Sequence, residues 1–308
     1  MRVLLIGPGD VSVVHLAAIE KLGAELVGVC DSATDYRAML DDQRPDVVHI
    51  CTPHDRHVPI ALEALARGAH VLLEKPVAHT IDEAARLVGA LAGFPDQQVG
   101  VCLQNRYNAT SQAAKNLLKT VSPVRGGSAT VFWHRDAAYY EERPWRGDKT
   151  RSGGGVLINQ AIHTIDLMQW LLGDVLAVEG HSGRFADISG TDVEDTANLL
   201  LEHAGGARSV VFATVTNAVD APVTIEIVTP SAVLHLRGDL TITHDDGRIE
   251  VITETPSNSE GRDYWGASHQ LLIADFYRAV EAGEPFWITP AEALKSQSVI
   301  DQIYRKSA

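Results

Sequence analysis

The stretch RVLLIGPGDVSVVHLAAIEKLG, residues 2–23, decides the fold. It opens with an apolar run, 2–7, that is typical of a strand buried on both faces. A glycine-rich turn follows, and then a helical pattern that ends at Gly23, a residue suited to the left-handed conformation after a helix. A strand, a Gly-x-Gly turn and a helix in this order predict the first unit of a nucleotide-binding β-α-β sheet.

The turn has the pattern Gly-x-Gly-x-x-Gly, with Ser12 in the third glycine position. The first glycine allows the tight turn, and the second lets the backbone approach a pyrophosphate at the helix N-terminus. The third position eases the packing of helix on strand, so a small serine fits there. We therefore predict that Gly7, Gly9, Asp10 and Val11 bind the pyrophosphate of a dinucleotide. A glycine turn without a nucleotide is the alternative.

Asp31 closes the second apolar strand, 25–30. A carboxylate at this place accepts hydrogen bonds from the adenosine ribose hydroxyls and repels a 2′-phosphate. The sequence therefore favours NAD over NADP as the cofactor. The nearby Arg37 is the reason to keep NADP as the less favoured alternative.

Strand and helix patterns alternate over the first 120 residues, and one of the helices begins with a capping box at Thr80 and Glu83. The strand-like runs are 2–7, 25–30, 46–52, 70–74 and 98–104. This order predicts an α/β fold whose N-terminal part, 1–120, is a doubly wound Rossmann domain.

The rhythm changes from about residue 124, where consecutive strand-like runs surround one long helical pattern, 156–173. A hairpin is expected to turn at Asp246 and Gly247. Consecutive strands with short turns predict a C-terminal α+β domain, 121–308, with a mostly antiparallel open sheet. Two helical patterns close the chain, and the last is a candidate for packing back on the Rossmann domain.

The composition is that of an ordinary globular protein with 308 residues, of which 45% are hydrophobic and 21% charged. The formal charge of −14 argues against binding to nucleic acid or to an anionic membrane and leaves a small molecule as the expected partner. No apolar run approaches the roughly 20 residues that span a bilayer, and the N-terminus is too short for a signal peptide.

The three cysteines, Cys30, Cys51 and Cys102, are widely spaced and odd in number, which indicates a reducing cytoplasm. Each lies near the end of an expected strand, so a shared thiol or metal site is an alternative to the common case of small buried cysteines. We found no established metal-binding motif and predict no metal.

Polar residues follow two of the apolar strands. Thr52 and Pro53 end the third strand, at the edge where such sheets bind ligands. His57, just beyond, either caps the next helix or lines the cofactor site. The fourth strand runs into Glu74-Lys75-Pro76, and a lysine at the mouth of a buried strand either extends its ammonium to water or takes part in chemistry.

The helical pattern 156–173 carries a polar stripe. Asn159, His163 and Asp166 are spaced i, i+4 and i+7, which places them on one helix face among apolar neighbours. His163 has the chemistry of a general base. The alternative is that His163 and Asp166 satisfy buried backbone groups, and for Asp166 we favour this alternative.

Three segments carry a family resemblance: IGPGDVSVVHLAAI (6–19), CTPHDRHVPIALEALARGAHVLLEKPVA (51–78) and GGGVLINQAIHTIDLMQWLLGD (153–174). In order and spacing they resemble the Gfo/Idh/MocA oxidoreductases, the glucose–fructose oxidoreductase and inositol dehydrogenase family. The resemblance implies an NAD(P)-dependent dehydrogenase or reductase acting on a secondary hydroxyl or ketone of a sugar, sugar derivative or cyclitol. It also implies an open C-terminal sheet that packs against a sister subunit in a homodimer or homotetramer.

The resemblance also assigns roles. Lys75 would lie beside the nicotinamide and stabilise the alkoxide character of the reacting hydroxyl, with Glu74 orienting it. In much of the family an aspartate stands where this chain has Asn159. His163 would then be less basic, and more of the proton transfer would fall to Lys75.

Further contacts are expected from three segments. LQNRYN (103–108) matches a family segment that lines the interface of cofactor and substrate, so Asn105 is expected on the nicotinamide side. Arg106 would hold substrate oxygens or form an interdomain ion pair. An aromatic beside an arginine suits stacking on a sugar or nicotinamide ring, or equally a packed loop. The remaining candidates for substrate contact are Trp145, Arg146, Tyr264 and His269.

Two other functions stay open: a non-enzymatic NAD-binding sensor, and a glycosidase that uses NAD transiently without net redox change. The presence of both Lys75 and His163 favours a dehydrogenase over a sensor, which needs neither. A plain interaction protein does not account for the glycine turn, Asp31 and Lys75 together.

Overall fold

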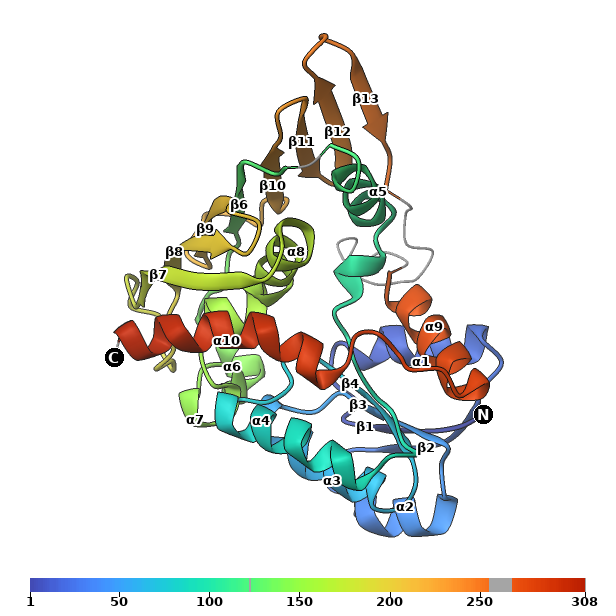
Figure 1. Cartoon of the computed structure of the whole chain (residues 1–308). Helices are drawn as coiled ribbons and strands as arrows, with labels where there is room; N and C mark the ends of the chain where they lie inside the picture. Colours follow the sequence, from blue (N-terminus) through green and yellow to red (C-terminus); the bar gives the residue numbers. More distant parts are fainter. Residues whose placement is uncertain (122, 255–267, 308) are drawn as a thin grey trace. The chain divides into compact units, whose positions relative to one another are not determined.

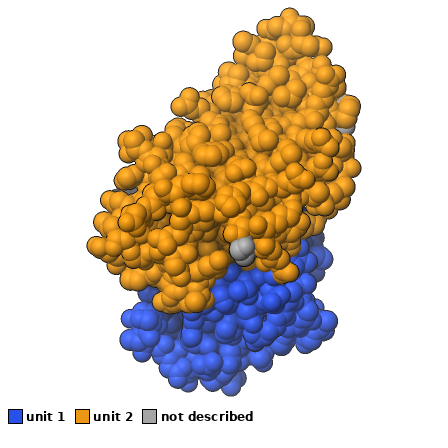
Figure 2. Space-filling model, turned by 90° about the vertical axis from the view of Figure 1, so that its left-hand side faces the viewer, with its two compact units in different colours: residues 1–107, 256–294 blue, residues 108–255, 295–308 orange. Residues whose placement is uncertain are grey.

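In the computed structural model, which describes residues 1–121, 123–254 and 268–307, the chain forms two compact units (Figure 2). Unit 1 comprises 1–107 and 256–294, and unit 2 comprises 108–255 and 295–308. This division differs from the ranges 1–120 and 121–308 expected from the sequence. The main difference is the helix α9, Ser268–Ala282, which belongs to unit 1 because its apolar face joins the core of that unit.

The sheet of unit 1 is parallel, with the strand order β2-β1-β3-β4-β5. The strands are β1 Arg2–Ile6, β2 Glu25–Cys30, β3 Val47–Ile50, β4 His70–Leu73 and β5 Val99–Val101. The strand order reverses at β1, which pairs with both β2 and β3. This confirms the predicted Rossmann sheet and places its topological switch point, where such sheets bind ligands, at the carboxyl ends of β1 and β3.

Helices cover both faces of this sheet (Figure 1). One face carries α1, Ser12–Lys21, beside α9, and the other carries α2, Tyr36–Gln43, α3, His57–Leu65, and α4, Ile81–Ala90. The start of α4 was predicted correctly, because the Thr80 hydroxyl accepts a hydrogen bond from the Glu83 N–H at 3.2 Å. Gly23 and Gly68, which follow α1 and α3, have φ values of +68° and +85°, as expected for glycines after a helix.

Unit 2 contains an eight-stranded sheet with the order β13-β12-β11-β10-β6-β9-β8-β7. Its strands are β6 Gly126–Phe132, β7 Val175–Gly183, β8 Thr196–His203, β9 Arg208–Thr214, β10 Thr224–Val228, β11 Ala232–Arg237, β12 Asp239–His244 and β13 Ile249–Ile252. All neighbours are antiparallel except β6 and β9. The hairpin of β12 and β13 turns at Asp246 and Gly247, whose φ is +85°, as predicted.

One face of this sheet is covered by helices and holds the core of unit 2. The covering helices are α5, Ala109–Leu118, α8, Ile162–Leu172, and the later part of α10, Pro290–Ser307. The segment 135–155, for which we predicted no helix, contains two short helices, α6 Ala137–Glu142 and α7 Lys149–Ser152. They are too short to show an apolar periodicity. In the sequence, only the capping residues Asp136 and Asp148 indicate where these helices start.

Within the described ranges, none of the helices has the length and apolar character that a membrane span requires.

Candidate functional site

The glycine turn after β1 contains two glycines, and the structure around them excludes a side chain at the first but not at the second. Gly7 has a φ of +94°, and a Cβ there would lie 2.7 Å from the Cys51 carbonyl carbon and the Thr52 nitrogen. The packing of β1 against β3 therefore requires this glycine. At Gly9 a Cβ would meet one described atom, the Cys51 oxygen, at 3.9 Å. The chain's own packing leaves room for a side chain at Gly9, so its absence fits the approach of a group that is not part of the chain.

The surroundings of the turn fit a phosphate-bearing ligand. Helix α1 starts after Val11 without a side-chain cap and without an acidic residue in its first turn. Among the described residues, the buried Thr52 hydroxyl at the end of β3 has no hydrogen-bond partner. An uncapped helix N-terminus and an unsatisfied hydroxyl at the switch point of the sheet together suit the pyrophosphate of a dinucleotide. Pro53 and Asp10 beside them are partly exposed.

Asp31 is exposed directly after β2. Its Oδ1 accepts hydrogen bonds from the Thr34 hydroxyl at 2.7 Å and from the N–H groups of Thr34 at 2.9 Å and Ala33 at 3.0 Å. The bond from the Thr34 hydroxyl is the main reason that the pKa of Asp31 is lowered. Arg37 donates from Nε to Glu63 at 3.0 Å. A fixed carboxylate with a paired arginine nearby suits ribose hydroxyls better than a 2′-phosphate.

His57 does not have either of the roles that we expected. Its ring is fully buried, with Nδ1 2.8 Å from the Pro76 carbonyl and Nε2 3.0 Å from the Thr52 carbonyl. Burial is the main reason that the pKa of His57 is lowered. The imidazole therefore neither caps α3 nor offers a nitrogen to a cofactor. Instead it connects the loop after β3 to the loop after β4.

The loop after β4 carries Glu74 and Lys75, and the two side chains differ in exposure. Lys75 is half-buried, whereas Glu74 is 5% exposed. The Glu74 Oε1 lies 3.0 Å from His15 Nε2, and its Oε2 accepts a hydrogen bond from the Lys75 backbone N–H at 3.2 Å. The carboxylate is thus buried beneath α1, and the contact of Glu74 with the cofactor that the resemblance implies stays a prediction. Its hydrogen bond from Lys75 comes from the main chain of the lysine.

Glu74 belongs to a buried polar cluster under α1 and α9 that sequence reasoning missed. His15 Nδ1 lies 2.9 Å from His49 Nδ1, and His49 Nε2 lies 2.9 Å from the Tyr277 hydroxyl. His269 Nε2 lies 3.4 Å from Glu74 Oε1. His269 is 2% exposed and its imidazole is part of this cluster, so its contact with substrate stays a prediction.

The protonation states in the cluster follow from these contacts. Burial favours the neutral form of His15, but its polar neighbours, Cys51 first and Glu74 among the others, outweigh burial and raise its pKa well above the usual value. Burial, reinforced by the positive charge of His15, holds the pKa of His49 well below it. His15 is therefore the cation that faces the Glu74 anion, and neutral His49 accepts from His15 and donates to Tyr277.

The donor atoms of His15, Glu74 and His269 lie within 4.8 Å of one another, a spacing that a metal ion can bridge. A metal ligand must be deprotonated, and the raised pKa of His15 keeps a proton on the nitrogen that faces Glu74. We therefore describe the group as an ion pair, and the prediction of no metal stays a prediction.

Arg106 was expected at the substrate or in an ion pair between domains. Its side chain is fully buried in the turn 104–107, where it donates to Glu292 at 3.0 Å and stacks on Trp287. The ion pair that we gave as the alternative is therefore present; it joins the two sequence ranges expected as domains and lies within unit 1, and a substrate contact of Arg106 stays a prediction. Asn105 beside it is half-buried, and its contact with the nicotinamide stays a prediction.

In unit 2, the helical segment 156–172 has two accessible polar side chains. Every residue from Gly154 to Gln169 is buried except Asn159 and His163. The expected continuous α-helix is instead a π-helical turn, Val156–Ala161, followed by α8. Asp166 is 1% exposed, which fits the alternative that we favoured for it, a side chain that satisfies buried groups. Single π-turns inside helices occur frequently at functional sites.

Glu194 and Tyr304 hold the start of this segment, and sequence reasoning missed both. The Glu194 carboxylate is 9% exposed and accepts hydrogen bonds from the N–H groups of Gly155 and Leu157 and from the Tyr304 hydroxyl. Burial raises the pKa of Glu194, and these donors only partly oppose it. No local pattern links Glu194 or Tyr304 to Gly155, because the three are far apart in the sequence.

The remaining predicted substrate residues lie in the segment before Gly153 or outside the described residues. Trp145 and Arg146 form a short turn, and the Arg146 guanidinium lies 4.3 Å from the centre of the Tyr139 ring. Their contact with substrate stays a prediction. Tyr264 lies outside the described residues.

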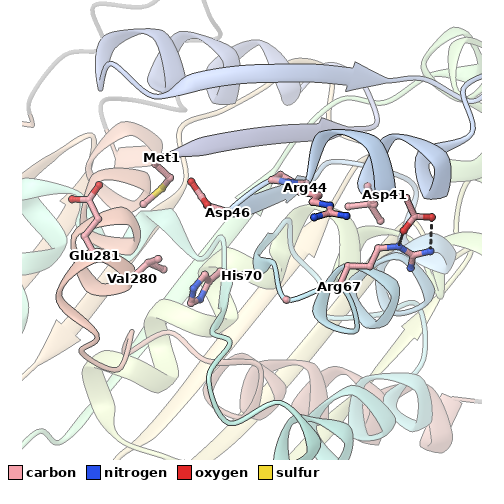
Figure 3. A pocket seen from close by; sticks show the side chains of 11 residues that line it. Met1, Asp41, Arg44, Asp46, Arg67, His70, Val280 and Glu281 are labelled. Carbon is pink, nitrogen blue, oxygen red and sulfur yellow. Dashed lines mark hydrogen bonds and ion pairs between the residues drawn. The ribbon is translucent and has the colours of Figure 1, made fainter.

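A pocket of about 780 Å³ lies in unit 1 at the amino ends of β1, β3 and β4 (Figure 3). Met1, Asp46 and His70 mark these strand ends, and Arg67 at its rim is bound to Asp41. The glycine turn and Lys75 follow the carboxyl ends of the strands. This pocket is therefore separate from the expected cofactor edge.

The parallel sheet and the glycine turn define the class of dinucleotide-binding Rossmann proteins, and family comparisons narrow this class to oxidoreductases. Residues 15–97 match the model of an oxidoreductase family with an NAD-binding Rossmann fold, and residues 112–235 match the Gfo/Idh/MocA C-terminal domain. The chain belongs to the Gfo/Idh/MocA family.

Two curated relatives illustrate the similarity. A levoglucosan dehydrogenase from Pseudarthrobacter phenanthrenivorans is 28% identical over 62% of this chain and 55% of its own length. Inositol 2-dehydrogenase 2 from Saccharopolyspora erythraea is 28% identical over 67% of this chain and 56% of its own length. The chain thus spans about half the length of the curated relatives that it matches.

Solved structures cover the chain more fully. The WlbA dehydrogenase from Bordetella pertussis, in complex with NADH and UDP-GlcNAcA, is 27% identical with a TM-score of 0.84 and covers 100% of this chain and 96% of its own. A levoglucosan dehydrogenase in complex with NADH and levoglucosan has a TM-score of 0.83 at 21% identity over 100% of this chain and 98% of its own, which shows a shared fold.

Proposed function

We propose that the chain is an NAD-dependent dehydrogenase that moves a hydride between the nicotinamide and a secondary hydroxyl, or the corresponding ketone, of a sugar, sugar derivative or cyclitol. The observation that carries the proposal is the place of Lys75. It follows β4 at the same edge of the parallel sheet as the glycine turn and Thr52, and its side chain is half-buried. NAD, when bound, would accept the hydride.

The proposed roles follow from the chemistry of the side chains. The Lys75 ammonium stabilises the negative charge that develops on the substrate oxygen as hydride leaves. His163 is an accessible imidazole on an otherwise buried helix and takes the hydroxyl proton. Asn159 shares this exposure and provides a neutral hydrogen-bonding group beside it. The sugar and cyclitol substrates named for the relatives support the substrate class.

The assay follows the absorbance of NADH with NAD or NADP and a panel of sugars, cyclitols, sugar acids and nucleotide sugars. We expect a substrate-dependent signal with NAD. Lys75→Ala should lower kcat/KM by about a thousandfold or more and leave NADH affinity within a few-fold. His163→Ala should lower kcat/KM about a hundredfold. Full activity of Lys75→Ala would contradict the proposal.

A silent panel with intact NADH binding would instead favour the sensor or the redox-neutral glycosidase. Cleavage of glycosides without net NADH would then separate those two.

The cofactor site is tested by a matched pair of glycine variants. Gly9→Ala should leave the free energy of unfolding within about 1 kcal/mol of wild type, because a Cβ has room there, and should weaken NADH binding about tenfold or more. Gly7→Ala should destabilise the protein by about 2 kcal/mol or more, because of its positive φ and the contact with Cys51. Urea unfolding and NADH fluorescence titration give the two quantities. Unchanged NADH affinity in Gly9→Ala would exclude the turn as the pyrophosphate site.

We further propose that the sheet of unit 2 forms a homodimer interface, with a homotetramer as the larger alternative. Leu200, Val210 and Phe212 are 36%, 50% and 39% exposed on neighbouring positions of β8 and β9. Apolar side chains gathered on an uncovered sheet face are typical of an interface between copies. Sedimentation equilibrium should give at least twice the monomer mass, and a monomer would contradict the proposal.

A further inference from the structure

The start of the helical segment that carries Asn159 and His163 is buried, which creates a demand for hydrogen bonds. The first four N–H groups of a helix have no partner within the helix. Gly155, Val156, Leu157 and Ile158 are all buried, so water does not supply these partners.

Two residues from distant parts of the chain meet this demand. The Glu194 carboxylate accepts from the Gly155 N–H at 2.7 Å and from the Leu157 N–H at 3.0 Å, while its backbone carbonyl accepts from the Val156 N–H at 3.0 Å. Tyr304 acts on these groups through Glu194. The Tyr304 hydroxyl in turn donates to Glu194 at 2.8 Å.

The glycines before the helix are shaped to these two residues. A Cβ at Gly155 would lie 1.9 Å from the Glu194 carbonyl oxygen, and a Cβ at Gly154 would lie 2.1 Å from the Tyr304 hydroxyl. Glu194 and Tyr304 therefore lie so close to the backbone that neither position can carry a side chain. The next residue along the segment is Asn159, whose N–H bonds to the Gly155 carbonyl at 2.9 Å.

We propose that Glu194, together with Tyr304, is a positioning residue for Asn159 and His163: it fixes the start of the π-helical turn and thereby the direction in which these two side chains point. The reason is geometric, because the rotation of a helix about its axis is set where its first N–H groups are held. The functional part of this inference rests on the proposed roles of Asn159 and His163. A displacement of about 1 Å at a reacting group costs as much as a hundredfold in rate.

The experiment compares Glu194→Gln and Tyr304→Phe with wild type and with Glu281→Gln, which removes an exposed carboxylate in unit 1. Glutamine keeps the shape of Glu194 but turns an NH2 group toward one of the two helix N–H groups. We expect kcat to fall about tenfold or more in Glu194→Gln and less in Tyr304→Phe, with NADH affinity unchanged. The imidazole resonance of His163, assigned with His163→Asn in protein with 15N-labelled histidine, should shift in both variants and stay in place in Glu281→Gln.

Wild-type kcat and an unmoved His163 resonance in both variants would overturn the inference. A parallel loss of kcat, NADH affinity and folding would also overturn it, because Glu194 would then be a structural residue only. Should Glu194→Gln fail to fold, Tyr304→Phe decides, since it removes a single hydroxyl. A wild-type enzyme without turnover on any substrate would defeat the proposed function, and the His163 resonance alone would then test the positioning.

Discussion

The two units each contain a buried glutamate beside proposed catalytic residues, and the pKa values of the two glutamates are shifted in opposite directions. Glu74 is 5% exposed and Glu194 is 9% exposed. Burial alone raises the pKa of both, but the neighbouring imidazoles of His15 and His269, with His15 as the cation, bring the pKa of Glu74 well below its usual value. Glu194 faces backbone N–H groups and a phenol, and its pKa stays raised. Backbone N–H groups and a phenol therefore stabilise the charged form of Glu194 less than the cation His15 stabilises that of Glu74.

The largest effect that tests this comparison is the loss of the cation. His15→Leu leaves Glu74 without its charged partner, and we expect it to lower the free energy of unfolding by about 3–5 kcal/mol. The matched control is His244→Leu, which breaks a His–Glu pair of the same 3.0 Å length whose Glu250 partner is 43% exposed. This variant should lose about 1 kcal/mol or less. Equal losses in urea unfolding would break the comparison.

A smaller effect concerns pH. Because the pKa of Glu74 is lowered, its contribution to stability is present above its ordinary value of 4.5 and is lost as the pH falls through the lowered pKa. Because the pKa of Glu194 is raised, its contribution is complete below 4.5 and is lost as the pH rises through the raised pKa.

The stability of wild type relative to Glu194→Gln should therefore decline as the pH rises from about 4.5, with a slope of at most about 1.4 kcal/mol for each pH unit. Relative to Glu74→Gln it should stay level above that pH and decline below it. Urea unfolding over a pH series measures both differences. Slopes of the same sign for the two variants would show that their surroundings do not differ as described.

The fold was predictable because its signals are local. The glycine turn, Gly23 after α1, the Thr80 cap and the Asp246-Gly247 turn each depend on a few adjacent residues. The apolar strands of unit 1 and the alternating strands of unit 2 similarly show their burial in their own pattern. These signals were sufficient for both sheets and for most helix and strand boundaries.

The site was less predictable because its contacts join distant segments. His57 and His269 look like ligand-binding histidines in the sequence, yet both are buried against partners from other elements. The π-helical turn was missed for the same reason. A single helical pattern runs through 156–173, and the structure shows its start held by Glu194 and Tyr304, whose approach no local pattern records.

The place of α9 in unit 1 has a consequence for the order of folding during synthesis. Domains generally fold as units while the chain emerges N-terminus first, but the cluster around Glu74 includes His269 and Tyr277 from α9. All of the strands of unit 2 are therefore synthesised before the last partners of Glu74 leave the ribosome. During that time the nascent Rossmann sheet carries a buried carboxylate, next to Lys75, that lacks part of its hydrogen-bond partners. The cluster around Glu74 is therefore completed late in folding.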